Sequence, residues 1–329
     1  MSTWIKLPDE DTMLRGPLYE DDYRPQFSGH ETFPLRYGWL KKAYDEVLDC
    51  LEVGNNRSIF LGEDAIARFG VGKNMVASIR HWATVVCVIE DDLSAGRIVP
   101  GELGQLIFGW DGEQGLDPYL ENPSTLWLIH WQLAARPNKT TWYWVFNHFP
   151  GIQFDRHQIV DALEKLANDS NWGRVSVATI KRDVECFVRS YVAHPATGKN
   201  STEDTIESPL AELGLMKPVG KRDGFRLVIG SKPSLGSGVF LYALANFWRE
   251  SSYRGLNQLP FDAIARSPGS PGRVFLLDEN DLADRLINIE EASEGTFSWS
   301  ETSGIKGIIK NPNRRIKYKP LNYILSDYI

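Results

Sequence analysis

Two capped amphipathic helices followed by a strand pair form the sequence pattern that most constrains the fold of this chain. Asp155 precedes a helix predicted over Arg156–Asn168, and Ser176 precedes a second helix predicted over Val177–Tyr191. Two short strands around an Asp-Gly turn follow, at Leu215–Val219 and Phe225–Ile229. Two helices that lead into a hairpin indicate a winged-helix unit.

The second of these helices resembles the recognition helix of DeoR-type winged-helix regulators over the run VSVATIKRDVECFV, which starts at Val175. In that family the corresponding helix enters the DNA major groove, and a hairpin wing follows it. The resemblance implies that Ile180, Val184 and Phe187 pack inward. The DNA contacts expected in this unit are Thr179, Lys181, Arg182, Lys221 and Arg222. The polar segment His194–Ser208, inserted before the wing, departs from a minimal winged helix.

An N-terminal helix-turn-helix is predicted from a similar pattern. Apolar residues from Leu35 to Leu51 recur at three- and four-residue steps, a short helix is expected at Glu63–Phe69, and a glycine turn leads into a longer helix at Lys73–Ile89. Any three-helix bundle can share this outline. The DNA contacts expected here are Lys73, Asn74, Arg80 and His81, although His81 can equally be a solvated neighbour of the buried Trp82.

A third module is predicted near the C-terminus, with helices at Val239–Arg249, Phe261–Arg266 and Leu282–Ile289 before a hairpin at Gly295–Ile309. The predicted fold class is mainly α with small β hairpins (α+β), built from tandem winged-helix or helix-turn-helix modules. The expected division is a flexible arm over 1–26, an N-terminal domain over 27–123 with an acidic loop, an aromatic helical core with a winged helix over 124–236, and a C-terminal module with a basic tail over 237–329.

The segment from Ser124 to Phe149 is the most aromatic part of the chain. It contains Trp127, His130, Trp131, Trp142, Trp144 and His148. Such rings can stack unpaired bases, but at helical spacing they more often fill a core, and we favour the core interpretation. Ser124 caps an expected buried helix, whereas Thr140–Phe149 fits either a strand or a helix.

The net charge of −7 does not by itself exclude DNA binding, because its location matters. The stretch from Glu90 to Glu121 has eight acids and one base, and so accounts for −7. Its first three acids could hold Mg²⁺, but a solvated loop or a surface for a basic partner is the favoured interpretation. Bases gather between Lys306 and Lys319, where Arg314, Arg315 and Lys317 are candidate phosphate contacts and an ordinary solvated end is equally plausible.

Several classes of protein are disfavoured. The three cysteines are scattered without CxxC spacing, which favours a reducing, cytoplasmic environment. No apolar run is long enough to span a bilayer, and the N-terminus lacks a secretion signal, so no membrane partner is expected. The phosphate-binding and dinucleotide-binding glycine motifs are missing, so no nucleotide cofactor is predicted.

The motif Ser28-Gly29-His30-Glu31-Thr32-Phe33, with Arg36 one turn further on, is the clearest candidate for chemistry. A histidine beside a carboxylate can bind a metal or relay a proton. The alternative, which we favour, is a helix cap in which Glu31 or Thr32 satisfies free backbone amides and His30 packs at a domain joint.

Three strings, FSGHETFPLRYGWL from Phe27, FGVGKNM from Phe69 and SIRHW from Ser78, resemble the markers of an uncharacterised bacterial domain family found beside DNA phosphorothioation genes. The resemblance extends from Phe27 to Tyr318. It implies a component of the single-strand phosphorothioation (Ssp) system, which has a role in anti-phage defence. The implied partners are double-stranded DNA, an ATPase, an ATP pyrophosphatase and a cysteine desulfurase.

The resemblance further implies a DNA-nicking endonuclease that opens the backbone for sulfur and uses a divalent metal, Mg²⁺ or Mn²⁺. No catalytic residue can be transferred from the family, so the candidate site is His30 as general base, Glu31 as metal ligand or orienting group, and Arg36 as phosphate stabiliser. A non-catalytic DNA-binding adaptor that recruits the sulfur-transfer machinery is the alternative. A transcriptional regulator is a third hypothesis.

Overall fold

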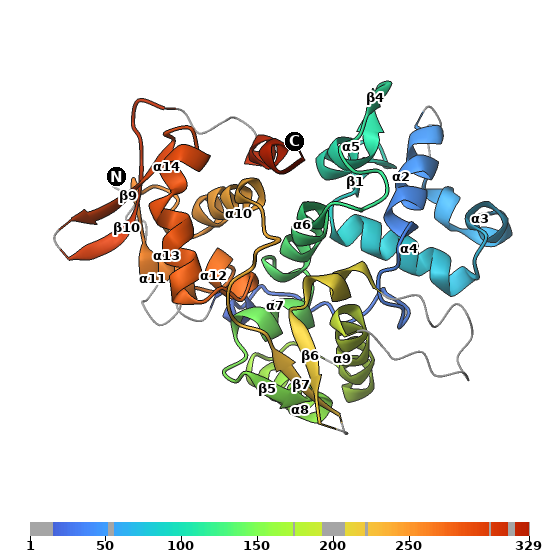
Figure 1. Cartoon of the computed structure of the whole chain (residues 1–329). Coiled ribbons are helices and arrows are strands. Elements are labelled where there is room, and N and C mark those ends of the chain that lie inside the picture. The colour runs from blue at the N-terminus through green and yellow to red at the C-terminus, as the bar shows by residue number, and fades with distance from the viewer. Residues whose placement is uncertain are drawn as a thin grey trace, which may run out of the picture.

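The computed structural model describes residues 16–51, 56–173, 175–192, 208–220, 223–302, 304–314 and 320–328. Helices dominate, and all the described strands belong to small antiparallel sheets, as predicted for the α+β class. The elements form three groups around the central helix α6 (Pro123–Ala134). The C-terminal group lies on the left of Figure 1, the N-terminal group on the right, and the middle group, which begins with α7 (Thr140–Asn147), below.

The N-terminal unit spans residues 39–100, and α5 and a short hairpin follow it. Its elements are α2 (Trp39–Asp49), η2 (Arg57–Phe60), α3 (Gly62–Phe69), α4 (Lys73–Val85), β1 (Ile89–Asp92) and β2 (Arg97–Pro100). After it come α5 (Glu102–Phe108), β3 (Gly109–Trp110) and β4 (Glu113–Gln114), while η1 (Pro17–Tyr19) precedes it. The hairpins β1–β2 and β3–β4 were not predicted within this acidic stretch.

Helix α4 ends earlier than the sequence pattern predicted. The prediction of a helix to Ile89 is wrong, because Cys87 takes a left-handed φ of 60° and the Val88 amide donates back to the Ala83 carbonyl at 2.9 Å. The chain turns there, and Ile89 begins β1 instead. Val86, Val88 and Ile89 are all buried, so the apolar run fills the core across the turn and resembles a longer helix in sequence.

The middle unit spans residues 140–227 and follows the predicted pattern closely. Its elements are α7, β5 (Gln153–Asp155), α8 (Arg156–Asp169), α9 (Val177–Tyr191), η4 (Pro209–Leu213), β6 (Met216–Val219) and β7 (Gly224–Leu227). The Asp155 side chain accepts from the Gln158 amide and the Gln158 side chain accepts from the Asp155 amide, which together form a capping box at the start of α8. Strand order is β5-β7-β6. Thr140–Asn147 is helical, which decides between the two structures expected for that segment.

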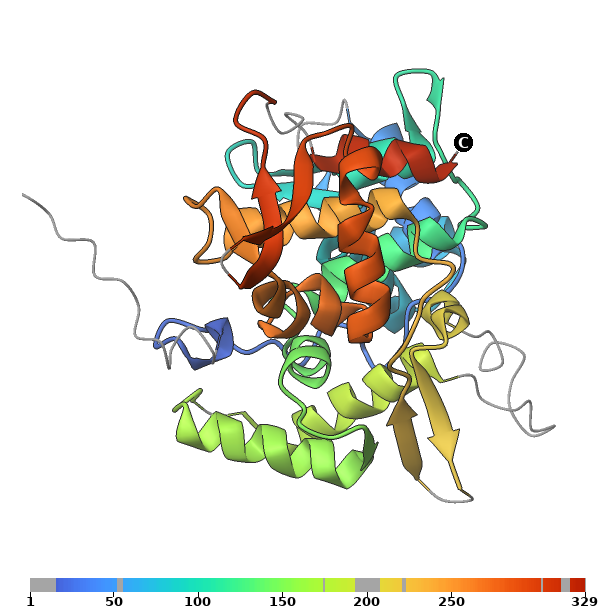
Figure 2. The ribbon, with the colours of Figure 1, turned by 60° about the vertical axis from the view of Figure 1, so that its left-hand side comes forward.

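The C-terminal unit spans residues 237–310 and repeats the connectivity of the middle unit. Its elements are α10 (Ser237–Glu250), β8 (Gln258–Pro260), α11 (Phe261–Arg266), α12 (Pro271–Val274), α13 (Glu279–Ile287), α14 (Ile289–Ala292), β9 (Phe297–Thr302) and β10 (Ile305–Lys310). Its strand order is β8-β10-β9, so in both units the strand before the helices pairs with the last strand of the hairpin. Figure 2 shows the two hairpins extending from different sides of the molecule.

In the N-terminal unit a side chain bonds to the last strand of the hairpin. The buried Asn56 donates its side-chain amide to the Ile98 carbonyl at 2.8 Å, and its side-chain oxygen accepts from the Ile98 amide at 2.7 Å. Ile98 belongs to β2, the last strand of that hairpin, so Asn56 occupies the ladder position that β5 and β8 occupy in the other units. All three units thus share one order of elements.

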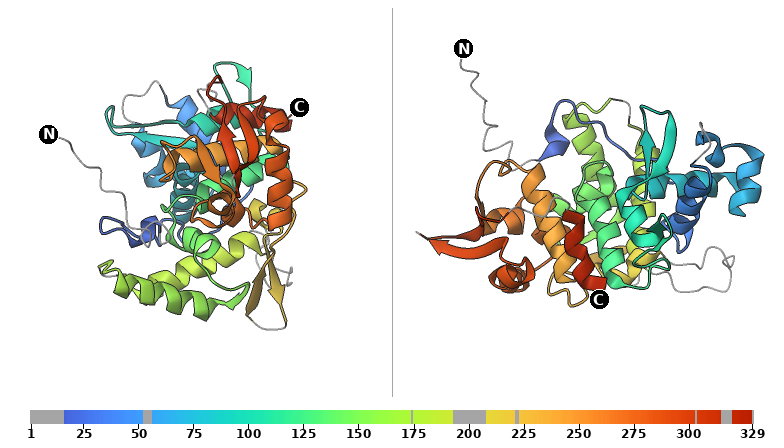
Figure 3. Two further views of the ribbon diagram at one scale, coloured as in Figure 1. Left: turned by 90° about the vertical axis from the view of Figure 1, so that its left-hand side faces the viewer. Right: turned by 90° about the horizontal axis from the view of Figure 1, so that it is seen from above.

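A single buried cluster runs through the three units. Trp127, Trp131, Trp142 and Trp144 are buried within it, which confirms the core interpretation for the tryptophans of α6 and α7. The C-terminal segment η5 (Pro320–Tyr328) lies beside α10, as Figure 3 shows from two sides. The Asp327 carboxylate accepts from the backbone amides of Gly238 and Val239 at 2.8 Å each, and so caps α10. No described helix is long and apolar enough to cross a membrane.

Candidate functional site

The first two turns of α9 present basic side chains to solvent. Ser176 caps the helix by accepting from the Thr179 amide at 3.1 Å. Ile180, Val184 and Phe187 are buried on the inner face, while Lys181 and Arg182 are exposed. The hydroxyl groups of Thr179 and Ser176 lie 2.9 Å apart and share a hydrogen bond. The Thr179 hydroxyl, a predicted DNA contact, is therefore already bonded to the residue that caps the helix.

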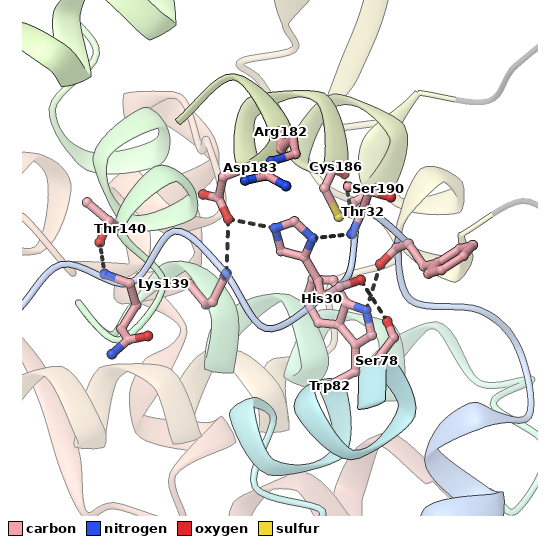
Figure 4. Close-up of polar contacts among 12 residues, drawn as sticks. His30, Thr32, Ser78, Trp82, Lys139, Thr140, Arg182, Asp183, Cys186 and Ser190 are labelled. Carbon is pink, nitrogen blue, oxygen red and sulfur yellow. Dashed lines mark hydrogen bonds and ion pairs between the residues drawn. The ribbon is translucent and has the colours of Figure 1, made fainter. Parts of the chain in front are cut away.

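Behind this exposed face, α9 contributes one charged residue to a buried ionic cluster, drawn in Figure 4. Asp183 is fully buried, and its Oδ1 lies 2.8 Å from His30 Nε2 and 3.2 Å from Lys139 Nζ. Lys139 is itself fully buried, with its ammonium 5.0 Å from the centroid of the Trp142 ring. Burial by itself raises the pKa of the Asp183 carboxyl, but Lys139 and His30 together hold that pKa below its usual value.

Hydrogen bonds fix the tautomer of His30. The Thr32 amide donates to Nδ1 at 3.0 Å, so Nδ1 is the acceptor nitrogen, and the proton on Nε2 is donated to Asp183. The backbone of the loop is also anchored, because the Ser78 hydroxyl donates to the His30 carbonyl at 3.0 Å and the indole of Trp82 donates to the Phe33 carbonyl. His30 thereby joins the loop before α2 to both α4 and α9.

The backbone at this loop adopts unusual conformations. Glu31 and Thr32 are consecutive non-glycine residues in the left-handed region, with φ values of 46° and 68°. Gly29 has a φ of 102°, and a Cβ atom added there would collide with the ring of His81. Both the Glu31 and the Thr32 side chains are exposed. A strained loop with an outward carboxylate is thus fixed on a buried ionic cluster.

The three residues of the candidate catalytic set lie in different surroundings. His30 is buried with both ring nitrogens bonded, and Glu31 is exposed. Arg36 is buried at 4% exposure, with its guanidinium carbon 5.5 Å from the Phe33 ring centroid and 5.4 Å from that of Trp39. Among the described residues, no group of three His, Cys, Asp or Glu side chains could hold a metal ion. Glu31 alone therefore does not form a resident metal site, and we derive no step through a metal.

Of the predicted DNA contacts in the N-terminal unit, two are exposed and two pack against other side chains of the protein. Lys73 and Asn74 are exposed in the first turn of α4. Arg80 is half-buried, 3.5 Å from Asp91. The ring of His81 packs 6.1 Å from that of His30, and burial, with Lys139 and His30 nearby, lowers its pKa to about 2. His81 is thus a half-buried neutral ring rather than a cationic ligand for phosphate.

The other predicted contacts are less informative. Arg314 is exposed, whereas Lys221, Arg222, Arg315 and Lys317 lie outside the described residues, as does most of the inserted segment 194–208. Two of the three acids considered as a possible Mg²⁺ site form ion pairs with bases: Asp91 lies 3.7 Å from Arg57, and Asp92 lies 3.9 Å from Arg97.

Sequence reasoning missed Asp183 and Lys139 as members of this site. The signal available for Asp183 was its position three residues after Ile180 and four before Phe187, on the apolar face of an amphipathic helix. A carboxylate on such a face requires a buried partner. Nothing in the local sequence identifies Lys139 as that partner.

The chain is thus a protein of three helix-and-hairpin units with a buried ionic cluster between them. Its sequence matches the family described as "Protein of unknown function (DUF4007)" over residues 27–323, and the chain belongs to that family. The chain is also similar to two solved structures of SspB. One, described as a magnesium ion-bound SspB crystal structure, has a TM-score of 0.74 with 29% sequence identity, covering 92% of this chain and 86% of that one. The other, an SspB crystal structure, has a TM-score of 0.73 at the same identity and coverage. No curated protein matches.

Proposed function

We propose that the chain is a DNA-binding component of a bacterial phosphorothioate modification system and that its middle unit is a winged helix whose α9 reads DNA. The observation that supports this most directly is the pair of exposed bases, Lys181 and Arg182, at the start of a capped helix whose inner face is buried. The helix is followed by an antiparallel hairpin that pairs back to β5, as in winged-helix proteins. The similarity to SspB supports the link to the Ssp system.

This proposal implies specific partners. Duplex DNA is the ligand, and the ATPase, the ATP pyrophosphatase and the cysteine desulfurase of the system are the protein partners. The local charge of α9 makes the proposal compatible with a net charge of −7, since phosphate contacts depend on nearby bases more than on the total.

Replacing Lys181 and Arg182 by alanine is expected to weaken duplex binding on the order of tenfold and to flatten the salt dependence by about two ions, because each lost phosphate contact releases about one counterion less. Fluorescence anisotropy at several salt concentrations measures both. Lys165→Ala, which removes an exposed base of α8, serves as the control and should bind as the wild type does. Unchanged affinity and slope in the double variant would exclude α9 from the DNA surface.

A second function, DNA nicking at the His30–Glu31–Arg36 site, is favoured by one specific observation. The Glu31 carboxylate is exposed on a left-handed backbone that His30 anchors to α9 through Asp183. Conformations of this kind are costly and tend to occur at functional sites. In this proposal Glu31 orients the attacking water at the phosphodiester, while His30 and the buried Arg36 position the loop from the interior. The alternative is a non-catalytic adaptor, which needs the DNA surface but no reacting group.

Incubating supercoiled plasmid with the pure protein tests the second function. If Glu31 acts in nicking, wild type converts the plasmid to open circle with Mg²⁺ or Mn²⁺ but not with a chelator, and Glu31→Gln loses at least 100-fold in rate while binding DNA normally. Asp22→Ala removes another exposed acid and should retain the rate. Nicking that survives Glu31→Gln moves the centre elsewhere. Absence of nicking with DNA binding retained, including after the partner proteins are added, favours the adaptor.

A further inference from the structure

A row of polar and basic side chains crosses the outward face of the middle sheet. In β7, Phe225 and Leu227 are buried while Arg226 between them is exposed. The register places Arg226 directly opposite Lys217 of β6 on one side and Gln153 of β5 on the other. Both Lys217 and Gln153 are exposed. The three side chains therefore form one line across three strands, on the face away from the core.

Lys217 and Arg226 are like charges in directly facing positions, an arrangement that destabilises a hairpin when nothing compensates it. Neither residue forms an ion pair with any residue in the described part of the chain. A third base nearby, Arg156, does form ion pairs. Arg156 lies over the Phe225 ring at 4.8 Å and forms ion pairs with Glu185 and with Asp223. Of these three bases, Lys217 and Arg226 are the two that form no ion pair within the described part of the chain.

The hairpins of the other two units provide an internal comparison. In the N-terminal unit the facing charged pair is Asp92 and Arg97, whose charged groups lie 3.9 Å apart. In the C-terminal unit it is Glu301 and Lys306, also 3.9 Å apart. Each of these two hairpins thus pairs opposite charges across its strands. The middle hairpin instead pairs two cations across its strands.

The helices that precede the middle and C-terminal hairpins also differ in charge. The start of α9 presents Lys181 and Arg182, whereas α13, which holds the corresponding place in the C-terminal unit, begins with Glu279 and contains the exposed Asp284. Its one base, Arg285, is bonded inward to Asp281 and to the carbonyls of Lys232 and Leu235. A phosphate backbone would be attracted to the middle unit and repelled by α13.

We propose that the outward face of the β5-β7-β6 sheet is a binding surface for the DNA sugar-phosphate backbone, with Lys217 and Arg226 as its phosphate contacts, and that the middle hairpin alone of the three acts as a DNA-binding wing. This rests on the proposed DNA binding and assigns it to one unit. A phosphate group supplies the counter-charge that Lys217 and Arg226 lack within the described part of the chain. Arg156 fixes the hairpin to α9 by joining Asp223 to Glu185, so helix and wing present a single rigid surface.

The test compares hairpins in the full-length protein, using anisotropy of a labelled duplex of about 30 base pairs, long enough for one such protein. Lys217→Ala/Arg226→Ala is expected to lose on the order of tenfold in affinity and about two ions of salt dependence. Arg97→Ala/Lys306→Ala, which removes the facing bases of the other two hairpins, is expected to bind as wild type. An equal loss in both double variants, or no loss in the first, would overturn the assignment to the middle hairpin.

A single charge reversal separates binding from folding. Lys217→Glu places an acid opposite Arg226, so the melting temperature is expected to rise while DNA affinity falls by more than in Lys217→Ala. A melting temperature that falls would show that the two cations do not repel in the free protein, which contradicts the argument. Wild-type protein that fails to bind duplex DNA would overturn the proposed function itself, whereas wild-type binding with unaffected hairpin variants overturns this inference alone.

Discussion

Replacing Asp183 by alanine is expected to lower the free energy of unfolding by about 3–5 kcal/mol, the usual cost of removing one member of a buried ion pair. Lys139 is fully buried and its ammonium lies 3.2 Å from Asp183 Oδ1, so the variant would leave a cation in the interior without a counter-charge. His30 would also lose the acceptor of its Nε2 proton. Urea unfolding followed by circular dichroism measures the change.

Two further variants show whether the cost arises from the unpaired charge. Lys139→Met in the Asp183→Ala background removes the stranded cation and should recover part of the lost stability, since apolar replacements of buried pairs are often tolerated. Asp161→Ala, at an exposed acid of α8, is the matched control and should change stability little. If Asp183→Ala is as stable as the control, Lys139 does not depend on Asp183 for its charge.

Lowering the pH from 7.5 to 5 is expected to destabilise the protein by several kcal/mol. Burial lowers the pKa of His130 to about 4 and that of His148 to about 4, and the nearby bases Lys232 and Arg273 act in the same direction. In the unfolded chain these groups take up protons near pH 6.5. The unfolded state therefore binds more protons as the pH falls from 6.5 towards 4, and at pH 5 each histidine costs roughly 2 kcal/mol. The stability that these two neutral histidines contribute is fully present above pH 6.5 and decreases as the pH falls below that value.

The hydrogen bonds of His130 explain why its buried ring stays neutral. Its Nδ1 lies 2.8 Å from the Tyr191 hydroxyl and its Nε2 lies 2.8 Å from the Val274 carbonyl, so Nε2 donates and Nδ1 accepts in the neutral ring. A second proton would remove the acceptor. Asp183, with its lowered pKa, adds to acid sensitivity only at lower pH.

Urea titrations at pH 7.5 and 5 check the pH dependence. His130→Gln should be less stable at pH 7.5 yet lose less on acidification than wild type, because one titrating group is gone. His157→Ala, at an exposed position of α8, should keep the wild-type pH dependence. An unfolding free energy that stays constant between pH 7.5 and 5 would contradict the neutral buried histidines.

The aromatic and helical framework could be predicted from sequence because its signals are local. The capping box at Asp155 and the cap at Ser176 fix the starts of α8 and α9, and their apolar spacing fixes the buried faces. The marker strings beginning at Phe27 identified the family. Local signals failed where the chain turns without glycine, as at Cys87, whose left-handed backbone ends α4 before the apolar run does.

The sequence by itself determined the class of fold, the main helices of the middle unit and the family. Only the tertiary structure decided that His30 bonds to Asp183, 153 positions away, that the Asn56 side chain bonds to the backbone of Ile98, and that Lys217 faces Arg226. The reason is physical: caps and periodicity depend on neighbours within about one helical turn, whereas ion pairs and strand register depend on how separate elements pack. The strand register distinguishes the middle hairpin, where two cations face each other, from the other two hairpins, where opposite charges face each other.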